Sequence, residues 1–338
     1  MKRANNLIEA VADADNLRLA FWKARKGKSY SQEVEAFRAN LDENLTILRG
    51  QILRGCVEVG NYRYFKIYEP KERQICASAF KEQVLHHALM NVCHEYFEKY
   101  QIDESYASRK GKGTYAAIEK AQLFTKKYPY FLKLDVKKFF ESIHHDVMKK
   151  QLRRLFKDNN LLCIFDQIID SYEAHPNRGL PIGNLTSQYF ANHFLASLDH
   201  FIKEKLLIKA YVRYMDDMVL WHDDKNVLKT ALKEIENYIE TELLSILKPS
   251  LLNTSLRGLS FLGYRIFPDD LTLTHNSKYR FIKKLKYLQE KYDKAEWCEA
   301  KCQRKALPLL AFTQHANTIG LRKKVLEIQV NCQKGLTV

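Results

Sequence analysis

The sequence lacks the features of a secreted or membrane-bound protein. Its seven cysteines are odd in number and form no CxxC pair, which argues against a disulfide framework and a structural zinc site. The N-terminus has no apolar signal segment, and no apolar run approaches the length that crosses a membrane. Internal repeats and low-complexity tracts are also absent. We therefore expect a globular protein of a reducing cytoplasm, with no membrane partner.

Acidic residues are scarce relative to basic ones. The 338 residues include 40 Asp or Glu against 55 Lys or Arg, a net charge of +15. A chain of this length can form a large core and two or three subdomains around one cleft. The excess of positive charge predicts a polyanionic partner bound through its phosphates, and a basic protein without such a partner is the alternative.

The positive charge is concentrated near the C-terminus. Residues 276–338 contain 14 Lys or Arg and 5 Asp or Glu, so under a fifth of the chain carries +9 of the net charge. Four aromatic residues lie among these charges: Tyr279, Tyr287, Tyr292 and Trp297. A solvated helical face would explain charge alone, but the mixture of charge and aromatic rings favours a surface that holds a nucleic-acid duplex.

Hydrophobic periodicity predicts a mixture of helices and strands. Leu41, Leu45, Leu48 and Ile52 recur at helical spacing in an N-terminal helical region of about 58 residues. Further helices are expected over about 81–100, between the strand at 130–135 and about residue 172, and from about residue 186 onward. Two more are expected over 226–243 and in the basic C-terminal region. Alternating patterns predict strands at 62–68, 73–76, 130–135 and 259–268.

Two adjacent carboxylates stand in the middle of an apolar run. In residues 211–221, Tyr-Val-Arg-Tyr-Met-Asp-Asp-Met-Val-Leu-Trp, the flanks predict strand, turn and strand with Asp216 and Asp217 on the turn. Two neighbouring charges in such a setting are costly unless cations neutralise them, and Asp oxygens suit Mg²⁺. An ordinary hairpin, in which the Asp pair only favours the turn, is the alternative.

A third carboxylate, Asp135, ends the strand predicted at 130–135. It precedes Asp216 by 81 residues, as expected for two non-adjacent strands of one small sheet. Two-metal nucleotide addition requires carboxylates from separate strands at one point, with the metals about 4 Å apart. We therefore expect Asp135 and Asp216 to bridge two metal ions, with Asp217 in support.

These motifs resemble the catalytic centre of reverse transcriptases. The Tyr-Met-Asp-Asp turn is similar to the polymerase centre of that family. Residues 131–143, Phe-Leu-Lys-Leu-Asp-Val-Lys-Lys-Phe-Phe-Glu-Ser-Ile, resemble its first catalytic motif. The resemblance implies that Val136 belongs to the metal site, and Phe139 and Phe140 to the nucleotide site. A Phe140 ring beneath the incoming sugar would clash with a 2′-hydroxyl and select deoxynucleotides; core packing is the alternative.

Residues 178–188, Arg-Gly-Leu-Pro-Ile-Gly-Asn-Leu-Thr-Ser-Gln, resemble the next family motif, a glycine loop that enters a helix. Gly183 would let the backbone approach the template–nucleotide pair and so belong to the nucleotide site. Thr186 or Ser187 would cap the helix.

Two positions of this motif depart from the usual family pattern. A Gln normally precedes the glycine and a Pro normally follows the serine, whereas this sequence has Ile182 and Gln188. Loss of the amide next to the incoming nucleotide implies relaxed selection at template bases, with Ile182 and Arg73 as the residues that would set it. The variant is similar to reverse transcriptases of diversity-generating retroelements.

Other family elements follow in order. Residues 69–73, Glu-Pro-Lys-Glu-Arg, resemble the fingers hairpin, in which Lys71 and Arg73 would bind the triphosphate; incidental surface charge is the alternative. Lys248 would protonate pyrophosphate, or else be merely exposed to solvent. The expected nucleic-acid contacts come from a template loop at 106–114, the glycine motif, the catalytic turn and a primer grip: Arg109, Gln188, Tyr214, Met215, Phe261, Leu262, Gly263 and Tyr264.

The resemblance extends from about residue 55 to 335 and implies a right-hand polymerase of the α+β class. Fingers, with the N-terminal helices, would cover 1–128. A ferredoxin-like palm would cover 129–268, with a fingers insertion near 148–180. A basic helical thumb would cover 269–338.

The implied function is RNA-directed DNA synthesis from dNTPs with two Mg²⁺ ions, or Mn²⁺ in their place. The product would be error-prone cDNA, misread mainly at adenines of a template-repeat RNA and used to diversify a target gene. Template RNA, a cDNA or primer strand and an oligomeric accessory variability determinant protein are the implied partners. The resemblance also implies a bacterial or phage-encoded protein.

Three other functions compete with this interpretation. A phage-defence (abortive-infection-like) reverse transcriptase would make partly or wholly untemplated DNA. Group II intron and retron enzymes fit less well, because they usually keep the Gln-Gly or Ser-Pro pattern. A catalytically inactive RNA-binding protein would not need to retain Asp135, Asp216 and Asp217.

Overall fold

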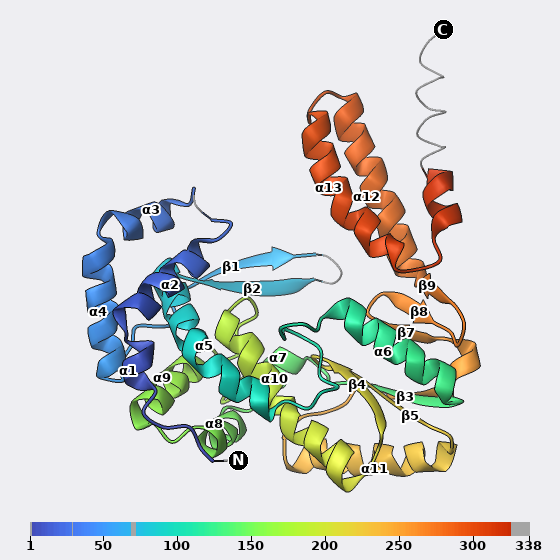
Figure 1. Ribbon diagram of the computed structural model, residues 1–338, viewed down its shortest axis with the longest axis horizontal. Coiled ribbons are helices and arrows are strands. Elements are labelled where there is room, and N and C mark those ends of the chain that lie inside the picture. Colours follow the sequence, from blue (N-terminus) through green and yellow to red (C-terminus); the bar gives the residue numbers. More distant parts are fainter. Residues whose placement is uncertain (1, 29, 69–71, 326–338) are drawn as a thin grey trace.

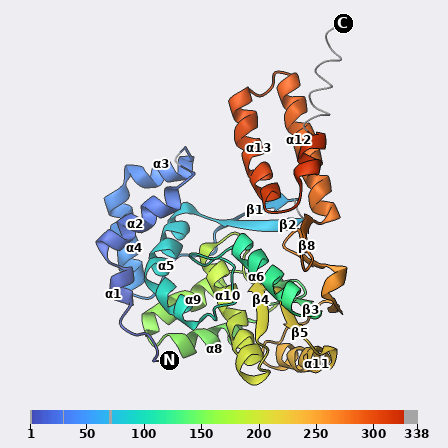
Figure 2. The ribbon, with the colours of Figure 1, turned by 45° about the vertical axis from the view of Figure 1, so that its right-hand side comes forward.

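The computed structural model describes residues 2–28, 30–68 and 72–325 (Figure 1). Its N-terminal region contains five helices and a hairpin: α1 Ile8–Val11, α2 Ala14–Arg25, α3 Gln32–Ala39, α4 Leu41–Leu53, β1 Tyr62–Ile67, β2 Arg73–Ser78 and α5 Phe80–Tyr100. Helices α1, α2 and α3 pack against α5 in one core. The β1–β2 hairpin extends from this helical body toward the C-terminal helices (Figure 2).

Four antiparallel strands form the central sheet, in the order β4-β5-β3-β6. These strands and their two crossover helices are β3 Tyr130–Asp135, α10 Leu185–His200, β4 Ala210–Tyr214, β5 Asp217–His222, α11 Lys225–Thr241 and β6 Leu251–Thr254. The βαββαβ order is that of the ferredoxin-like fold, which confirms the expected α+β class. The expectation of non-adjacent strands is confirmed for β4, which leads into the Asp216 turn and is separated from β3 by β5. Strand β5, which follows the turn, lies directly beside β3.

Side chains of the central sheet alternate between two cores. Leu132, Leu134 and Leu220 belong to the larger core, which includes α10 and α11. Phe131 and Trp221 belong to a second core that includes α6, Thr114–Lys127. Because both faces are covered, β3 and β5 are largely apolar, and apart from Lys133 their charged side chains lie at the strand ends.

Three helices between β3 and α10 complete the larger core: α7 Phe139–Ser142, α8 His145–Leu155 and α9 Asn159–Asp170. A π-helical segment, Phe201–Lys205, leads from α10 toward β4. Three short antiparallel strands then follow β6 and a 3₁₀ turn (Ser255–Arg257): β7 Leu259–Phe261, β8 Tyr264–Ile266 and β9 Leu271–Leu273.

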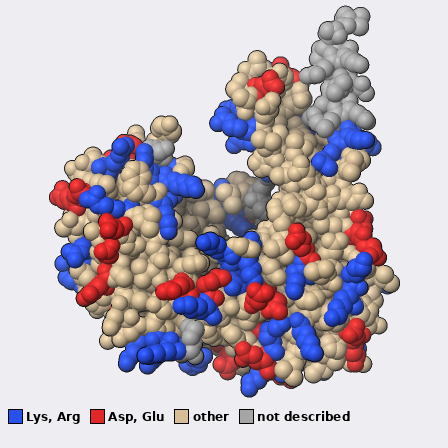
Figure 3. All heavy atoms as spheres, viewed as in Figure 1, with Lys and Arg blue, Asp and Glu red and all other residues tan. Residues whose placement is uncertain are grey.

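The C-terminal helices form a separate projection. Helices α12, His275–Asp293, and α13, Glu299–Gln314, pack together around a small core of their own. They rise from β7–β9 and stand apart from the N-terminal helices in both ribbon views (Figures 1 and 2). The space-filling view is hollowed between these two parts, with Lys and Arg atoms along the floor of the hollow (Figure 3). The molecule therefore has the right-hand shape of a polymerase.

Most predicted elements are confirmed, including the strands at 62–68, 73–76 and 130–135 and the helix over 81–100. Strands β6 and β9 were missed because they have only four and three residues, too few to produce an alternating pattern. Within the described residues, no helix has the length and apolarity needed to cross a bilayer. The six cysteines in that part of the chain are free.

Candidate active site

The register of the central sheet brings the predicted carboxylates together. Asp135, the last residue of β3, pairs directly with Asp217, the first residue of β5. Asp216 occupies the two-residue turn between β4 and β5 with Met215, whose φ of 55° lies in the left-handed region. Such a conformation is strained for a side chain larger than glycine, so the surrounding contacts must hold the turn in place.

The ionised forms of Asp216 and Asp217 are destabilised by their surroundings. Burial, followed by the neighbouring Asp135 charge, raises the pKa of Asp216. Burial also raises the pKa of Asp217 to about 6, although Lys133 beside it acts in the opposite direction. A site that raises carboxyl pKa values in this way favours the binding of a cation.

Two lysines supply positive charge to the site. The Lys248 ammonium donates to both carboxylate oxygens of Asp135, each at 2.8 Å, and its backbone N–H donates to the Asp135 carbonyl at 2.8 Å. Lys133 lies 3.2 Å from each oxygen of Asp217 and donates to the Ser260 carbonyl at 2.7 Å. Lys248 therefore contacts the carboxylate rather than being merely exposed to solvent.

The donors present fit Mg²⁺, which prefers oxygen ligands. Within residues 2–28, 30–68 and 72–325, no group of three His, Cys, Asp or Glu side chains is arranged as a ready metal cluster. Asp135 and Asp217 are instead held in ion pairs with Lys248 and Lys133. A metal at these carboxylates would have to displace Lys248. Val136 has a hydrocarbon side chain, which is also buried, so only its backbone carbonyl could contribute to a metal site.

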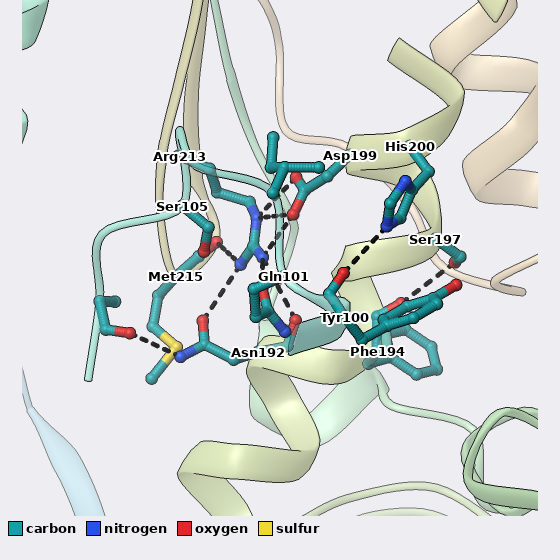
Figure 4. A network of polar contacts seen from close by, with 12 residues as sticks. Tyr100, Gln101, Ser105, Asn192, Phe194, Ser197, Asp199, His200, Arg213 and Met215 are labelled. Atoms are coloured by element: carbon teal, nitrogen blue, oxygen red, sulfur yellow. Dashed lines mark hydrogen bonds and ion pairs between the residues drawn. The ribbon is translucent and has the colours of Figure 1, made fainter. Parts of the chain in front are cut away.

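A buried ion pair supports the catalytic turn (Figure 4). Arg213 and Asp199 are both 0% exposed and are joined by three hydrogen bonds of 2.6–2.9 Å. The Arg213 guanidinium also donates to the Met215 carbonyl at 3.1 Å, to Asn192 of α10 and to Gln101 at the end of α5. One side chain thus ties the turn to two helices.

The glycine loop packs against the β1–β2 hairpin. The Cys76 N–H donates to the Ile182 carbonyl at 2.8 Å. Gly183 has φ +127°, and a Cβ there would lie 3.0 Å from Ile75 and 3.1 Å from the Cys76 carbonyl. The lack of a side chain at Gly183 therefore allows the loop backbone to pack closely against β2. Arg73 begins β2 and is exposed, whereas Lys71 lies outside the described residues.

The capping prediction for the helix after this loop was wrong. Helix α10 begins at Leu185, and its N-cap residue is Asn184, which makes no side-chain capping bond. Thr186 and Ser187 are buried in the first helical turn, and their hydroxyls have no hydrogen-bond partner among the residues that the structure describes. The helix thus begins one residue before Thr186.

Several side chains predicted to contact nucleic acid instead bond other residues of the protein. Arg109 is 8% exposed at its side chain; it pairs with Glu98 at 2.7 Å and donates to the Ser105 carbonyl at 2.8 Å. Its expected contact with a template backbone is therefore not supported. Gln188 is exposed on α10 and accepts a hydrogen bond from Ser108 at 3.1 Å.

The predicted primer-grip residues also differ in how deeply they are buried. Phe261 and Tyr264 are buried, and the Tyr264 hydroxyl donates to the Phe312 carbonyl at 2.6 Å, so these side chains do not face a nucleic acid. Leu262 and Gly263 form the turn of the β7–β8 hairpin. A Cβ at Gly263 would lie 3.0 Å from Ser277 Oγ and 3.2 Å from Phe312, so its close approach is to α12 and α13.

The two phenylalanines after β3 also differ in how deeply they are buried. Phe139 is 4% exposed and packs near Phe194 in the large core, so its assignment to the nucleotide site was wrong. Phe140 is only partly buried, with its ring centroid 5.6 Å from that of Phe139. Tyr214 is also partly exposed and accepts a hydrogen bond from Thr114 at 3.2 Å.

Lys133, Asp199 and Arg213 were missed from the sequence. Lys133 stands two residues before Asp135, and side chains two apart on a strand share a face, so the alternation could have revealed it. Arg213 in a run of buried strand residues was also a signal, because a buried arginine requires a carboxylate partner. The partner itself, 14 residues earlier on a helix, could not be chosen from several acidic residues.

The fold and the carboxylate site define a right-hand nucleic-acid polymerase. A family model for reverse transcriptases (RNA-dependent DNA polymerases) matches residues 69–266, more than half of the chain. The chain therefore belongs to the reverse transcriptase family.

Curated relatives include two intron proteins of Saccharomyces cerevisiae. The chain is 23% identical over 213 residues to the COX1/OXI3 intron 1 protein, which covers 59% of this chain and 25% of the yeast protein. It is 21% identical over 289 residues to the COX1/OXI3 intron 2 protein, which covers 67% of this chain and 32% of the yeast protein. The chain thus spans about a quarter to a third of the length of these relatives.

Two solved telomerase structures match part of the chain. Apo telomerase from Candida tropicalis has a TM-score of 0.48 at 13% identity, over 68% of this chain and 52% of that chain. Telomerase from Candida albicans, solved with a fragment of telomeric RNA, has a TM-score of 0.47 at 14% identity, over 68% of this chain and 50% of that chain.

Substitution of Asp217 tests the electrostatic cost of the site. Because its pKa is raised from an ordinary 3.8 to about 6, the metal-free protein should lose stability as the pH rises from about 4 to about 6. Asp217→Asn should therefore stabilise it at pH 8 by about 1–3 kcal/mol and have little effect at pH 4. Calorimetry in EDTA measures this, with the exposed Asp223→Asn as control. Equal destabilisation at both pH values would contradict the prediction.

Substitution of Arg213 tests the support of the turn. Arg213→Met leaves Asp199 as a buried unpaired charge and should cost about 3–5 kcal/mol in urea unfolding. The double variant with Asp199→Leu should lose less than Arg213→Met alone. Arg18→Met, which removes an exposed ion pair with Asp42, should change stability by less than about 1 kcal/mol. Additive losses in the double variant would show that the pair is not coupled.

Proposed function

We propose that this chain is an RNA-directed DNA polymerase. The observation that carries the proposal is the direct pairing of Asp135 with Asp217, beside Asp216, inside the region matched by the family model. In this proposal, residues 1–128 act as fingers, 129–268 as palm with an insertion near 148–180, and 269–338 as thumb. The hollow between the helical parts would hold the template and primer (Figure 3).

Three carboxylates would hold two divalent ions. Asp135, Asp216 and Asp217 supply oxygen ligands, with Mg²⁺ as the expected ion and Mn²⁺ as a substitute. Bound ions would lower the pKa of the primer 3′-hydroxyl and neutralise charge on the triphosphate. Lys248, displaced from Asp135, would be free to donate a proton to the departing pyrophosphate.

The chain's own side chains would select and orient the nucleotide. Arg73, exposed at the start of β2, would bind the triphosphate. The partly exposed ring of Phe140 would exclude a 2′-hydroxyl and so favour deoxynucleotides. Arg213 would keep the Asp216 turn in place while these groups bind.

Asp216→Asn separates catalysis from binding. The substitution removes a metal ligand without changing the basic helices, so RNA affinity should stay within about twofold while dNTP incorporation falls by about 10³-fold or more. Filter binding and primer extension measure the two quantities. Asp223→Asn, at an exposed position after β5, should retain both. Incorporation by Asp216→Asn at the wild-type rate would exclude the proposed chemistry.

The subgroup that the sequence favours is the reverse transcriptase of a diversity-generating retroelement. Support comes from Ile182 and Gln188 in the glycine motif and from the compact, basic C-terminal region. The enzyme would copy a template-repeat RNA into error-prone cDNA together with an oligomeric accessory protein. The yeast relatives are intron proteins, so an intron-type enzyme is the second candidate.

Sequencing of the DNA product distinguishes these functions. Purified protein would be given RNA transcribed from the DNA that flanks its own gene, with Mg²⁺ and four dNTPs. Errors clustered opposite adenines support the retroelement function. Faithful copying supports an intron-type enzyme, and products unrelated to the RNA support the phage-defence alternative.

Ile182→Gln tests the origin of the errors. A Gln amide at this position would bond the incoming nucleotide and should lower the misincorporation rate by about tenfold, since one hydrogen bond contributes about 1 kcal/mol or more to discrimination. Sequencing of primer-extension products measures the rate, and Ile182→Val is the apolar control. An error spectrum identical to that of the wild type would exclude Ile182 as its determinant.

A further inference from the structure

Lys133 places a charge in the middle of a largely buried strand. Side chains two apart on a strand share a face, so Lys133 lies on β3 between Phe131, which is 0% exposed in the second core, and Asp135 at the catalytic end. An apolar side chain at this position would extend the second core without the cost of removing a charge from water. The ammonium therefore requires partners that offset this cost, and those partners indicate what it does.

The Lys133 ammonium bridges two separate sheets. Its nitrogen lies 3.2 Å from each carboxylate oxygen of Asp217, the first residue of β5 in the central sheet. It also donates a 2.7 Å hydrogen bond to the carbonyl of Ser260, which belongs to β7 of the three-stranded sheet. The centroid of the Phe261 ring lies 5.9 Å from the same nitrogen, near the limit of a favourable cation–π contact. One side chain thus joins a catalytic carboxylate to the backbone of a neighbouring hairpin.

The β7–β8 hairpin is held at two places. Strand β7 is an outer strand of its sheet, and the hydrogen bond from Lys133 to Ser260 holds it to the central sheet. At the turn of the hairpin, the Gly263 carbonyl accepts a hydrogen bond of 3.1 Å from the N–H of Thr274, the N-cap residue of α12. Strands β7–β9 lie between the central sheet and the base of α12 in the ribbon view (Figure 1). Lys133 therefore ties this hairpin to the catalytic end of the central sheet.

We propose that Lys133 is a positioning residue for nucleotide addition, which holds the β7–β8 hairpin at a fixed distance from Asp217. The inference rests on the proposed function, in which the primer 3′-hydroxyl lies at the carboxylates and the hairpin turn, Leu262 and Gly263, contacts the primer. Without the bridge, the hairpin would no longer hold the primer end in place. A misplacement of reacting groups by about 1 Å is enough to lower a rate by about 100-fold.

Direct contact with a primer phosphate is the competing role for Lys133. The ammonium already donates to Ser260 and faces both carboxylate oxygens of Asp217, so a phosphate would have to displace these partners. The Asp217 carboxylate beside it would also repel a phosphate. The two roles differ in their consequences. A phosphate contact contributes to primer affinity, whereas a positioning residue contributes to the rate of the bound complex.

Hydrogen exchange tests the bridge without catalysis. The metal-free full chain is compared with Lys133→Met, which keeps the length of the side chain but removes its charge and its donors. Amides of β7 and β8 should exchange about tenfold faster in the variant, because a hydrogen bond to a charged group is lost. Amides of the β1–β2 hairpin should not change. Equal exchange of β7 and β8 in the variant and the wild type would overturn the inference.

Lys126→Met is the matched control. It removes an exposed ion pair of 2.8 Å with Asp269, which lies in the connection between β8 and β9 of the same small sheet. Because exposed ion pairs contribute little to stability, exchange of β7 and β8 should match that of the wild type.

Primer extension tests the role of Lys133 in the reaction. With Lys133→Met, kcat should fall by about 10- to 100-fold, while the Kd for primer–template and the KM for dNTP stay within about threefold of the wild type. Lys133→Arg should recover to within about fivefold of the wild-type kcat, because a guanidinium has enough donors for both the carboxylate and the carbonyl. Lys126→Met should match the wild type. A wild-type kcat in Lys133→Met, or a loss confined to primer affinity, would overturn the inference.

The two proposals fail in different ways. If the wild type incorporates no dNTP with Mg²⁺, the proposed function is refuted, and the role of Lys133 in it falls as well. If the wild type incorporates dNTPs and Lys133→Met exchanges and extends primers as the wild type does, the Lys133 inference alone is refuted. Lys133→Gln, which is neutral and shorter, gives the answer by the same two measurements if Lys133→Met does not fold.

Discussion

Three carboxylates held together at low exposure form the constraint on which the rest of the structure depends. The β3–β5 register brings Asp135 beside Asp217, and the turn adds Asp216. Burial, followed by repulsion from the neighbouring carboxylates, raises the pKa values of Asp216 and Asp217, so the folded protein carries an electrostatic cost at neutral pH. Lys133 and Lys248 offset part of that cost by direct ion pairs. Incompletely neutralised carboxylates of this kind favour the approach of a cation.

The surrounding scaffold resists this repulsion. Both faces of the central sheet are covered, so its strands cannot shift register without exposing apolar side chains. Arg213 spans from the Met215 carbonyl to Asp199 and Asn192 on α10 (Figure 4). Because Met215 has a left-handed backbone, these bonds hold a strained turn in one conformation. Stability and site geometry therefore depend on the same buried polar network.

The β1–β2 hairpin and the glycine loop form a second structural unit. Gly183 allows the loop to contact β2, and the hydrogen bond between Cys76 and Ile182 fixes the two together. This contact sets Ile182, the residue that departs from the usual family pattern, against the strand that begins with Arg73.

The sequence by itself determined the local elements and the family. The Asp216 turn, the strand ending at Asp135 and the basic C-terminal helices each follow from short-range patterns of polarity and charge. Only the tertiary structure decided which side chains face the cleft. Phe139, Phe261 and Tyr264 pack into cores, and Arg109 bonds Glu98, because burial and partner choice depend on residues distant in the chain. A short motif specifies backbone direction, whereas the exposure of its side chains is set by the elements that pack against it.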